Sequence, residues 1–216
     1  MTGDLQLAEL MAARLCHDLV GPIGAVANGI ELLGDAGGSP DPEVTGLIAV
    51  SARQATRRLQ WFRVAFGSAS GLPTSAMFAE TRRLAMGLFE EGRVTLDWGA
   101  PDAAAEATAS RAAAKLALNL SLFALECLPR GGSVRVRIVP NGVAVKINVA
   151  AEGPAARIPE DMQLALREGV AIGELTPKSI PAYLAARLVA QTGSRLDVRT
   201  PSGDRVEFVA DLPANT

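Results

Sequence analysis

Apolar residues recur at helical spacing along the first part of the chain. Between residues 5 and 33 they return every three or four positions, which predicts one long amphipathic helix. Pro22 lies inside this run and has no backbone N–H to donate, so we expect the helix to bend near residues 18–22. Residues 34–42 (GDAGGSPDP) end the helix. Its apolar stripe consists of Leu15, Leu19, Ile23, Val26, Ile30 and Leu33.

A second apolar stripe predicts a second helix, with Asp41 as its N-cap and Pro42 as its first residue. Residues 67–73 (GSASGLP) then have the composition of a linker. Two helices joined by a short loop form a hairpin, which cannot cover both of its apolar faces alone. We expect a second copy to cover them in a homodimeric four-helix bundle, the alternative being that residues 74–216 do so. The second stripe consists of Val44, Ile48, Ser51, Ala55, Leu59, Phe62 and Phe66.

The rest of the chain mixes helical spacing with the alternation of strands. The turn Pro140-Asn141-Gly142 joins two alternating segments and predicts a β-hairpin. Helices packed on a mixed sheet form an α/β sandwich, so we expect an α+β protein with a helical hairpin at residues 1–70 and a sandwich at 71–216. Helices are predicted at 75–91, 102–128, near 159–168 and near 178–192, and strands at 94–98, 133–139, 143–149, 195–199 and 204–211.

Composition narrows the classes of function. Among 216 residues, 21 are basic and 23 acidic, and this net charge of −2 argues against general binding of nucleic acid or anionic membranes. Two cysteines, Cys16 and Cys127, and one histidine are too few for a disulfide framework or a zinc site. No signal peptide or apolar run of roughly 20 residues is evident. We therefore expect a reduced, cytoplasmic protein without metal or membrane.

The one histidine, His17, is the first candidate for chemistry. On a helical wheel it lies about 160° from the middle of the apolar stripe and faces outward, with Arg14 nearby. A neutral imidazole is a nucleophile when its other ring nitrogen is held as a donor. We expect Asp18 to accept from the ring and Arg14 to offset charge on an attached phosphoryl group. The alternative is an idle surface histidine.

Two glycines on the same face predict a docking strip for another protein. Gly21 and Gly24 lie one and two turns beyond His17 and leave a flat surface that a partner helix can approach closely. The structural alternative is a weakened helix, since each interior glycine costs about 1 kcal/mol relative to alanine. We expect Cys16 to be a packing residue rather than a redox switch. The expected docking residues are Cys16, Val20, Gly21, Gly24 and Asn28.

Residues 14–23 (RLCHDLVGPI) resemble the H-box of sensor histidine kinases, and GAVANGIELL continues the first helix of their dimerisation domain. More faintly, residues 71–216 resemble the ATP-binding domain of these kinases, the Bergerat fold. Asn119 matches the first asparagine of the kinase N-box, but Phe123 replaces the second, which helps to hold magnesium. The adenine-binding DxGxG segment falls on AEGPA, where Ala151 replaces the aspartate and Ala155 replaces a glycine. The lid segment, KSIPAY at 178–183, has no glycine to cradle phosphates, so we expect no ATP binding.

A kinase-like hairpin joined to such a domain resembles the dimeric ChpT-type histidine phosphotransferases of alphaproteobacterial cell-cycle phosphorelays. The resemblance implies a homodimer in which His17 takes a phosphoryl group from the receiver domain of a hybrid histidine kinase and passes it to response regulators. It implies no cofactor on this chain, with Mg²⁺ belonging to the receiver. Three alternatives remain open: a scaffold without chemistry, an ATP-binding kinase-like protein, and a monomeric phosphotransferase.

Overall fold

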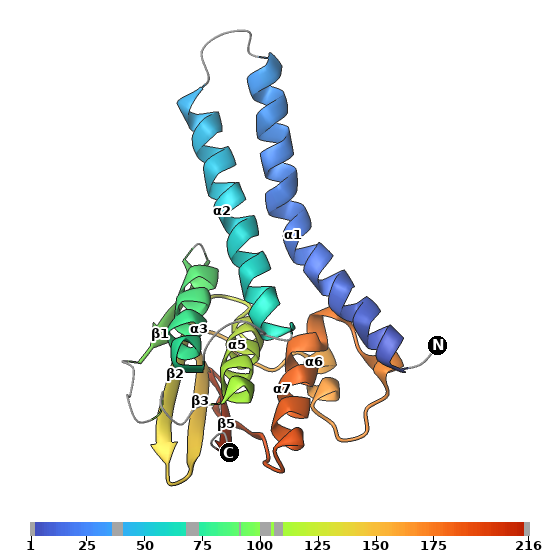
Figure 1. The fold of residues 1–216 in the computed structure, drawn as a ribbon, viewed down its shortest axis with the longest axis vertical. Helices are drawn as coiled ribbons and strands as arrows, with labels where there is room; N and C mark the ends of the chain where they lie inside the picture. Colours follow the sequence, from blue (N-terminus) through green and yellow to red (C-terminus); the bar gives the residue numbers. More distant parts are fainter. Residues whose placement is uncertain are drawn as a thin grey trace.

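The structure, a computed structural model, describes residues 3–35, 41–67, 74–90, 92–99, 105 and 110–213. Two long helices, α1 (Gly3–Asp35) and α2 (Pro42–Ala65), form a hairpin that projects from a mixed body of helices and strands (Figure 1). The predicted boundary at residue 70 lies outside the described residues. The body consists of α3 (Thr74–Phe89), β1 (Val94–Trp98), α5 (Arg111–Glu126), β2 (Gly132–Asn141), β3 (Ala144–Glu152), α6 (Glu160–Ala165), η1 (Ile172–Glu174), η2 (Pro177–Ser179), α7 (Ile180–Gln191), β4 (Asp197–Ser202) and β5 (Arg205–Pro213).

A five-stranded sheet in the order β1-β2-β3-β5-β4 forms one layer of the body. β1 runs parallel to β2, and the other pairs are antiparallel. The predicted β-hairpin is confirmed: β2 and β3 pair up to Asn141 and Ala144, and Gly142 has the positive φ of 62° that such a tight turn requires. Alternate residues of β3 and β5 are buried, because α3, α5 and α7 cover one face of the sheet (Figure 1). The expected α/β sandwich is therefore observed.

The core of the body forms around α5, most of whose side chains are buried. Phe123 packs on Phe208 of β5, with ring centroids 4.3 Å apart. At the base of the hairpin, Trp61 meets Phe62 and Phe66 in edge-on contacts. This aromatic cluster belongs to the same core as α5, so the base of the hairpin is fixed to the body.

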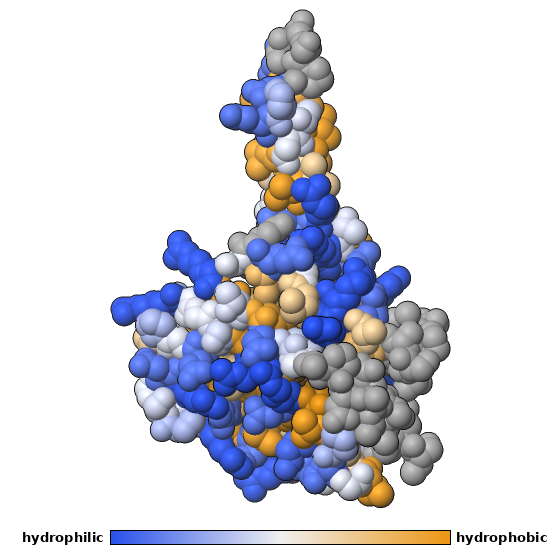
Figure 2. Space-filling model, turned by 90° about the vertical axis from the view of Figure 1, so that its left-hand side faces the viewer, coloured by the Kyte–Doolittle hydropathy of each residue, from blue (hydrophilic) through white to orange (hydrophobic). Residues whose placement is uncertain are grey.

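The upper part of the hairpin leaves apolar side chains exposed, as Figure 2 shows along the projection. The body reaches α1 through η1, η2 and α7, and α2 through α3 and α5, all at the base. The described residues of the body therefore leave the upper part of the hairpin uncovered, against the alternative considered from the sequence. Val20 is 70% exposed and Ile30 is 59% exposed. The exposed apolar set on the two helices consists of Leu5, Val20, Ile23, Ile30, Leu32, Leu47, Val50 and Leu59.

Several element boundaries differ from the sequence predictions. The helix predicted from residue 102 begins at Arg111, because Ser110 caps it by accepting from the backbone N–H of Ala113 at 3.1 Å. Residues 101–104 and 106–109 lie outside the described part. The helical turn η1 was not predicted, and β4 begins at Asp197 and extends to Ser202, beyond the strand predicted at 195–199. α1 is continuous through Pro22, and Figure 1 shows its lower half leaning away from its upper half, in line with the expected bend.

Contrary to the sequence expectation, one described helix, α1, is long and apolar enough to cross a membrane by length and composition alone. Its few charges are widely spaced, so its average hydropathy is high. A helix that buries its apolar face against protein passes the same test, which makes this weak evidence for a membrane span.

Candidate functional site

The imidazole of His17 lies at the surface of α1, as the helical wheel predicted. Its side chain is 82% exposed, whereas that of Asp18 is 11% exposed. Nδ1 of His17 lies 3.0 Å from Oδ1 of Asp18, which is hydrogen-bonding distance. A carboxylate at this position accepts from Nδ1–H, and the lone pair then resides on Nε2. The predicted contact between the two side chains is confirmed.

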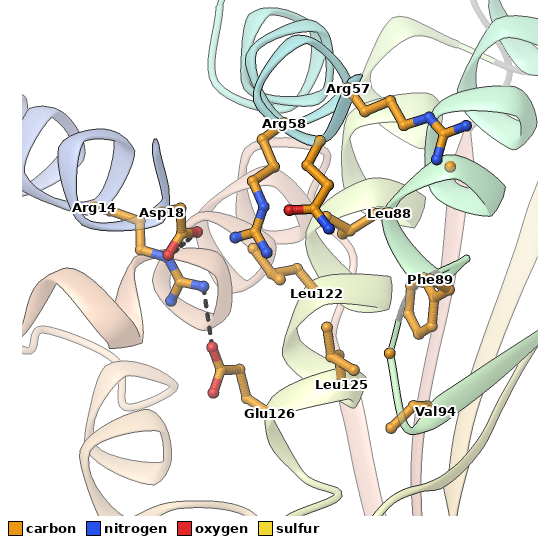
Figure 3. A pocket seen from close by; sticks show the side chains of 13 residues that line it. Arg14, Asp18, Arg57, Arg58, Leu88, Phe89, Val94, Leu122, Leu125 and Glu126 are labelled. Atoms are coloured by element: carbon orange, nitrogen blue, oxygen red, sulfur yellow. Dashed lines mark hydrogen bonds and ion pairs between the residues drawn. The ribbon is translucent and has the colours of Figure 1, made fainter. Parts of the chain in front are cut away.

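Arg14 does not lie on the outward face that the helical wheel predicted. It is only 5% exposed. Its Nε donates to Oδ2 of Asp18 at 2.9 Å, and its Nη2 donates to Oε1 of Glu126, at the end of α5, at 3.0 Å (Figure 3). The prediction for Arg14 was wrong because a helical wheel assumes that every side of a helix other than its apolar stripe faces solvent. In the structure, η2, α5 and α7 of the body approach the side of α1 that carries Arg14.

Four charged side chains therefore form a closed cluster between the hairpin and the body. Nζ of Lys178, in η2, lies 3.3 Å from Oε2 of Glu126, and the Lys178 carbonyl accepts from Arg14 Nη1 at 3.3 Å. Two cations, Arg14 and Lys178, balance two carboxylates, Asp18 and Glu126. The guanidinium of Arg14 is thus already engaged by two carboxylates. The expectation that it offsets phosphoryl charge at His17 does not agree with this placement.

The predicted docking strip is open to solvent along most of its length. Cys16, Val20, Gly21 and Asn28 are exposed, and Gly24 is half-buried. A methyl group added at Gly21 or Gly24 would meet nothing within 4 Å. Packing within the chain therefore does not require these glycines. Cys16 has a free, exposed thiol and is not a packing residue within this chain, which corrects that expectation.

A cavity of about 290 Å³ lies beside the cluster, between the hairpin, α3 and α5 (Figure 3). Arg14, Asp18 and Glu126 line one end of it. Arg57 and Arg58 of α2 line another part, together with apolar side chains such as Leu122. Arg57 pairs with Glu90 at 2.5 Å. Polar groups from three helices thus meet around this cavity, and one of them is Asp18, the residue that contacts His17.

The segments that resemble the kinase nucleotide motifs are engaged in contacts within the chain. Asn119 is fully buried, and its Nδ2 donates to the carbonyls of Ala65 at 3.2 Å and Lys115 at 2.9 Å. In the AEGPA loop, the Ala155 N–H donates to Oδ1 of Asp204 at 3.1 Å, and Ala155 has a φ of 59°.

The segment matching the lid is not a loop. It forms η2 and the first turn of α7, next to α1. Within the described residues, no group of three His, Cys, Asp or Glu side chains is placed to hold a metal ion.

Sequence reasoning missed the part of the cluster that comes from the body. Glu126 and Lys178 are 112 and 164 residues away from Arg14 along the chain. Neither lies in a local pattern that indicates pairing with α1. Glu126 lies at the end of an apolar helix, where a single charged residue indicates only that the helix reaches solvent. Only pairs of positions compared across many related sequences carry such a signal.

Known proteins resemble this chain in sequence and in fold. A family profile described as the histidine phosphotransferase C-terminal domain matches residues 78–204. Protein phosphotransferase ChpT of Brucella abortus (strain 2308) is 30% identical over 203 residues, covering 94% of both chains. A solved structure described as a bacterial phosphotransferase is 28% identical, with a TM-score of 0.77 over 95% of this chain and 96% of that one. The chain therefore belongs to the ChpT-type histidine phosphotransferases, which pass phosphoryl groups within a phosphorelay.

Proposed function

We propose that His17 is the residue that carries the phosphoryl group in this phosphotransferase. The observation that supports this most directly is the 82% exposed imidazole whose Nδ1 lies 3.0 Å from a nearly buried carboxylate. Asp18 then holds Nδ1–H and leaves Nε2 facing solvent as the nucleophile. The chain has no other histidine to compete for this role.

The proposed step transfers a phosphoryl group from the phosphorylated aspartate of a receiver domain. The lone pair of Nε2 forms a bond to phosphorus while the bond from phosphorus to the aspartyl oxygen breaks, and its electron pair leaves with the receiver carboxylate. The ring keeps its Nδ1 proton and becomes positively charged, which the Asp18 carboxylate stabilises. The reverse step delivers the group to a second receiver. In-line positioning dominates such transfers, and the Mg²⁺ that they use belongs to the receiver.

The partners in this proposal are the receiver domain of a hybrid histidine kinase, as donor, and response regulators, as acceptors. Receivers dock on the strip of Cys16, Val20, Gly21, Gly24 and Asn28. The openness of Gly21 and Gly24 supports this, because packing inside the chain does not explain why glycine stands there.

A second copy of the chain covers the apolar side chains on the hairpin, giving a homodimeric four-helix bundle. The exposure of Ile23 and Ile30 along one long helix supports this assembly. Burial of α1 against protein, rather than lipid, is consistent with the ion pairs that tie Arg14 to the body. The proposal includes a cytoplasmic location for the protein.

The body binds no ATP in this proposal. Phe123 is packed on Phe208 where the kinase motif has a polar residue, and Ala151 is fully buried in β3 where the motif has an aspartate. The lid segment is helical and lies against α1. A thermal-shift titration with Mg-ATP is expected to leave the melting temperature unchanged, and a saturable rise would contradict this part.

The experiment that tests the assignment is transfer from a phosphorylated receiver domain to the purified chain. We expect the wild-type chain to gain an acid-labile phosphoryl group and His17→Ala to gain none. Asp18→Asn keeps the size of the side chain but offers the wrong hydrogen bonds, and we expect it to react at least about a hundredfold more slowly. Label retained on His17→Ala would refute the assignment, and unchanged signalling by that variant would favour a scaffold.

A further inference from the structure

We propose that Glu126, on the body, is a positioning residue for the reaction at His17, acting through Arg14 and Asp18. The proposal rests on the proposed role of His17 and adds residues that act on it from outside the hairpin. It gives the body a part in phosphotransfer that requires no nucleotide.

A continuous series of short contacts leads from the body to the imidazole, and Figure 3 shows the part of it between Glu126 and Asp18. Oε1 of Glu126 lies 3.0 Å from Nη2 of Arg14, and Nε of Arg14 lies 2.9 Å from Oδ2 of Asp18. The other oxygen of Asp18, Oδ1, lies 3.0 Å from Nδ1 of His17. Each carboxylate oxygen of Asp18 therefore has one partner, and the rotation that sets one contact also sets the other.

Exposure is low in the first three members of this series and high at the reactive ring. The side chain of Arg14 is 6% exposed, that of Asp18 11% and that of Glu126 20%, whereas that of His17 is 82% exposed. Hydrogen bonds between charged groups are stronger and less screened when they are withdrawn from water. Arg14, the least exposed member, can thus hold Asp18 in one orientation, while the ring stays accessible to a partner.

Without Glu126, Arg14 loses one of its two anchoring carboxylates. Its guanidinium then has only Asp18 and the Lys178 carbonyl as partners, and both guanidinium and carboxylate gain freedom to turn. A neutral imidazole that is not held by an acceptor exchanges between its two tautomers, and only the Nδ1–H tautomer presents a lone pair at Nε2. Loss of Glu126 therefore lowers the fraction of rings that can react.

The test uses phosphoramidate, a small donor that needs no docking surface. Transfer to His17 breaks its P–N bond, forms the bond from Nε2 to phosphorus and releases ammonia. Its rate therefore reports the reactivity of the ring alone. We compare the full-length wild-type chain with Glu126→Gln, which keeps an acceptor and loses the charge, and with Glu126→Ala, which loses both. Glu80→Ala is the matched control, because it also removes a carboxylate bound to an arginine, Arg83, on α3.

We expect Glu126→Ala to react about tenfold more slowly, Glu126→Gln to be intermediate and Glu80→Ala to match the wild type. The second readout is the ¹⁵N shift of the ring, which reports the tautomer and comes from a single residue because the chain has one histidine. We expect the Nδ1–H population to fall in the same order.

Thermal melting of each variant separates positioning from folding. A Glu126→Ala chain that reacts at the wild-type rate, or one that is slower while its tautomer population is unchanged, would overturn the positioning role. His17→Ala serves as the independent control. If it accepts phosphoryl groups, the assignment of His17 fails; if it does not, while Glu126→Ala behaves as the wild type, only the role of Glu126 fails.

Discussion

Gly29 of α1 is buried against Ile48 of α2, and replacing this glycine by alanine tests the packing of the hairpin. The added Cβ would lie 2.5 Å from Cγ1 and 3.0 Å from Cδ1 of Ile48. Because Cγ1 is close to the backbone of a β-branched residue with few allowed rotamers, it cannot move aside easily. Gly21→Ala, which lies on the same helix, is the matched control, since its Cβ would meet nothing within 4 Å.

Both substitutions gain the higher helix propensity of alanine, but only Gly29→Ala also introduces a steric clash. Alanine stabilises a helix interior by about 1 kcal/mol relative to glycine at either site. Overpacking at Gly29 costs about 1–3 kcal/mol, as is usual for an added methyl group in a close-packed contact. We expect Gly21→Ala to raise the free energy of unfolding by up to about 1 kcal/mol. Gly29→Ala should therefore be about 1–3 kcal/mol less stable than Gly21→Ala.

Urea denaturation measures the free energy of unfolding of both variants. The protein concentration is kept fixed, because the stability of an oligomer depends on it. Ile48→Ala removes both clashing atoms, so the double variant Gly29→Ala/Ile48→Ala should recover the steric cost as a coupling energy. Equal stability of Gly29→Ala and Gly21→Ala would refute the reasoning. In addition, Gly21→Ala should slow transfer from a receiver while leaving the rate with phosphoramidate unchanged, because its methyl group obstructs docking only.

Three further predictions concern buried groups. Burial raises the pKa of the Cys127 thiol to about 12 from its usual 9.0. Between these two pH values only the unfolded chain loses the thiol proton, so the free energy of unfolding should fall by up to about 1.4 kcal/mol per pH unit. Denaturation curves of Cys127→Ala should lack this dependence on pH. A thiol reagent at neutral pH should modify only Cys16 in the folded chain and both thiols in guanidinium. Asn119→Ala leaves the Ala65 carbonyl without its donor and should cost about 1–3 kcal/mol, whereas Asn141→Ala, which breaks an exposed bond, should cost less than about 0.5 kcal/mol.

Local patterns in the sequence predicted most of the elements, because the spacing of apolar residues reflects which face each element buries. Both hairpin helices and all five strands were found in this way. The predicted ends of elements were less accurate where a helix cap or the position of a strand at the edge of the sheet decides them. Ser110 sets the start of α5, and β4 continues through Pro201 because an edge strand tolerates a residue without an N–H.

The site was predictable only as far as it lies on one helix. His17 and Asp18 are neighbours in sequence, and their contact follows from that. Arg14 was misplaced because its surroundings come from η2 and α5, and the two residues that engage it, Glu126 and Lys178, are distant in sequence. Pairing between charged residues that are far apart in the sequence produces no periodic pattern from which it can be predicted.

The charge cluster between the hairpin and the body also constrains how such proteins can change during evolution. Arg14, Asp18, Glu126 and Lys178 together are neutral, and loss of any one leaves an unbalanced charge in a cluster that is partly withdrawn from water. Replacements at these four positions are therefore expected to arise in combination rather than singly. Recombination that joins the hairpin of one relative to the body of another would succeed only where both parents carry matching charges at this junction.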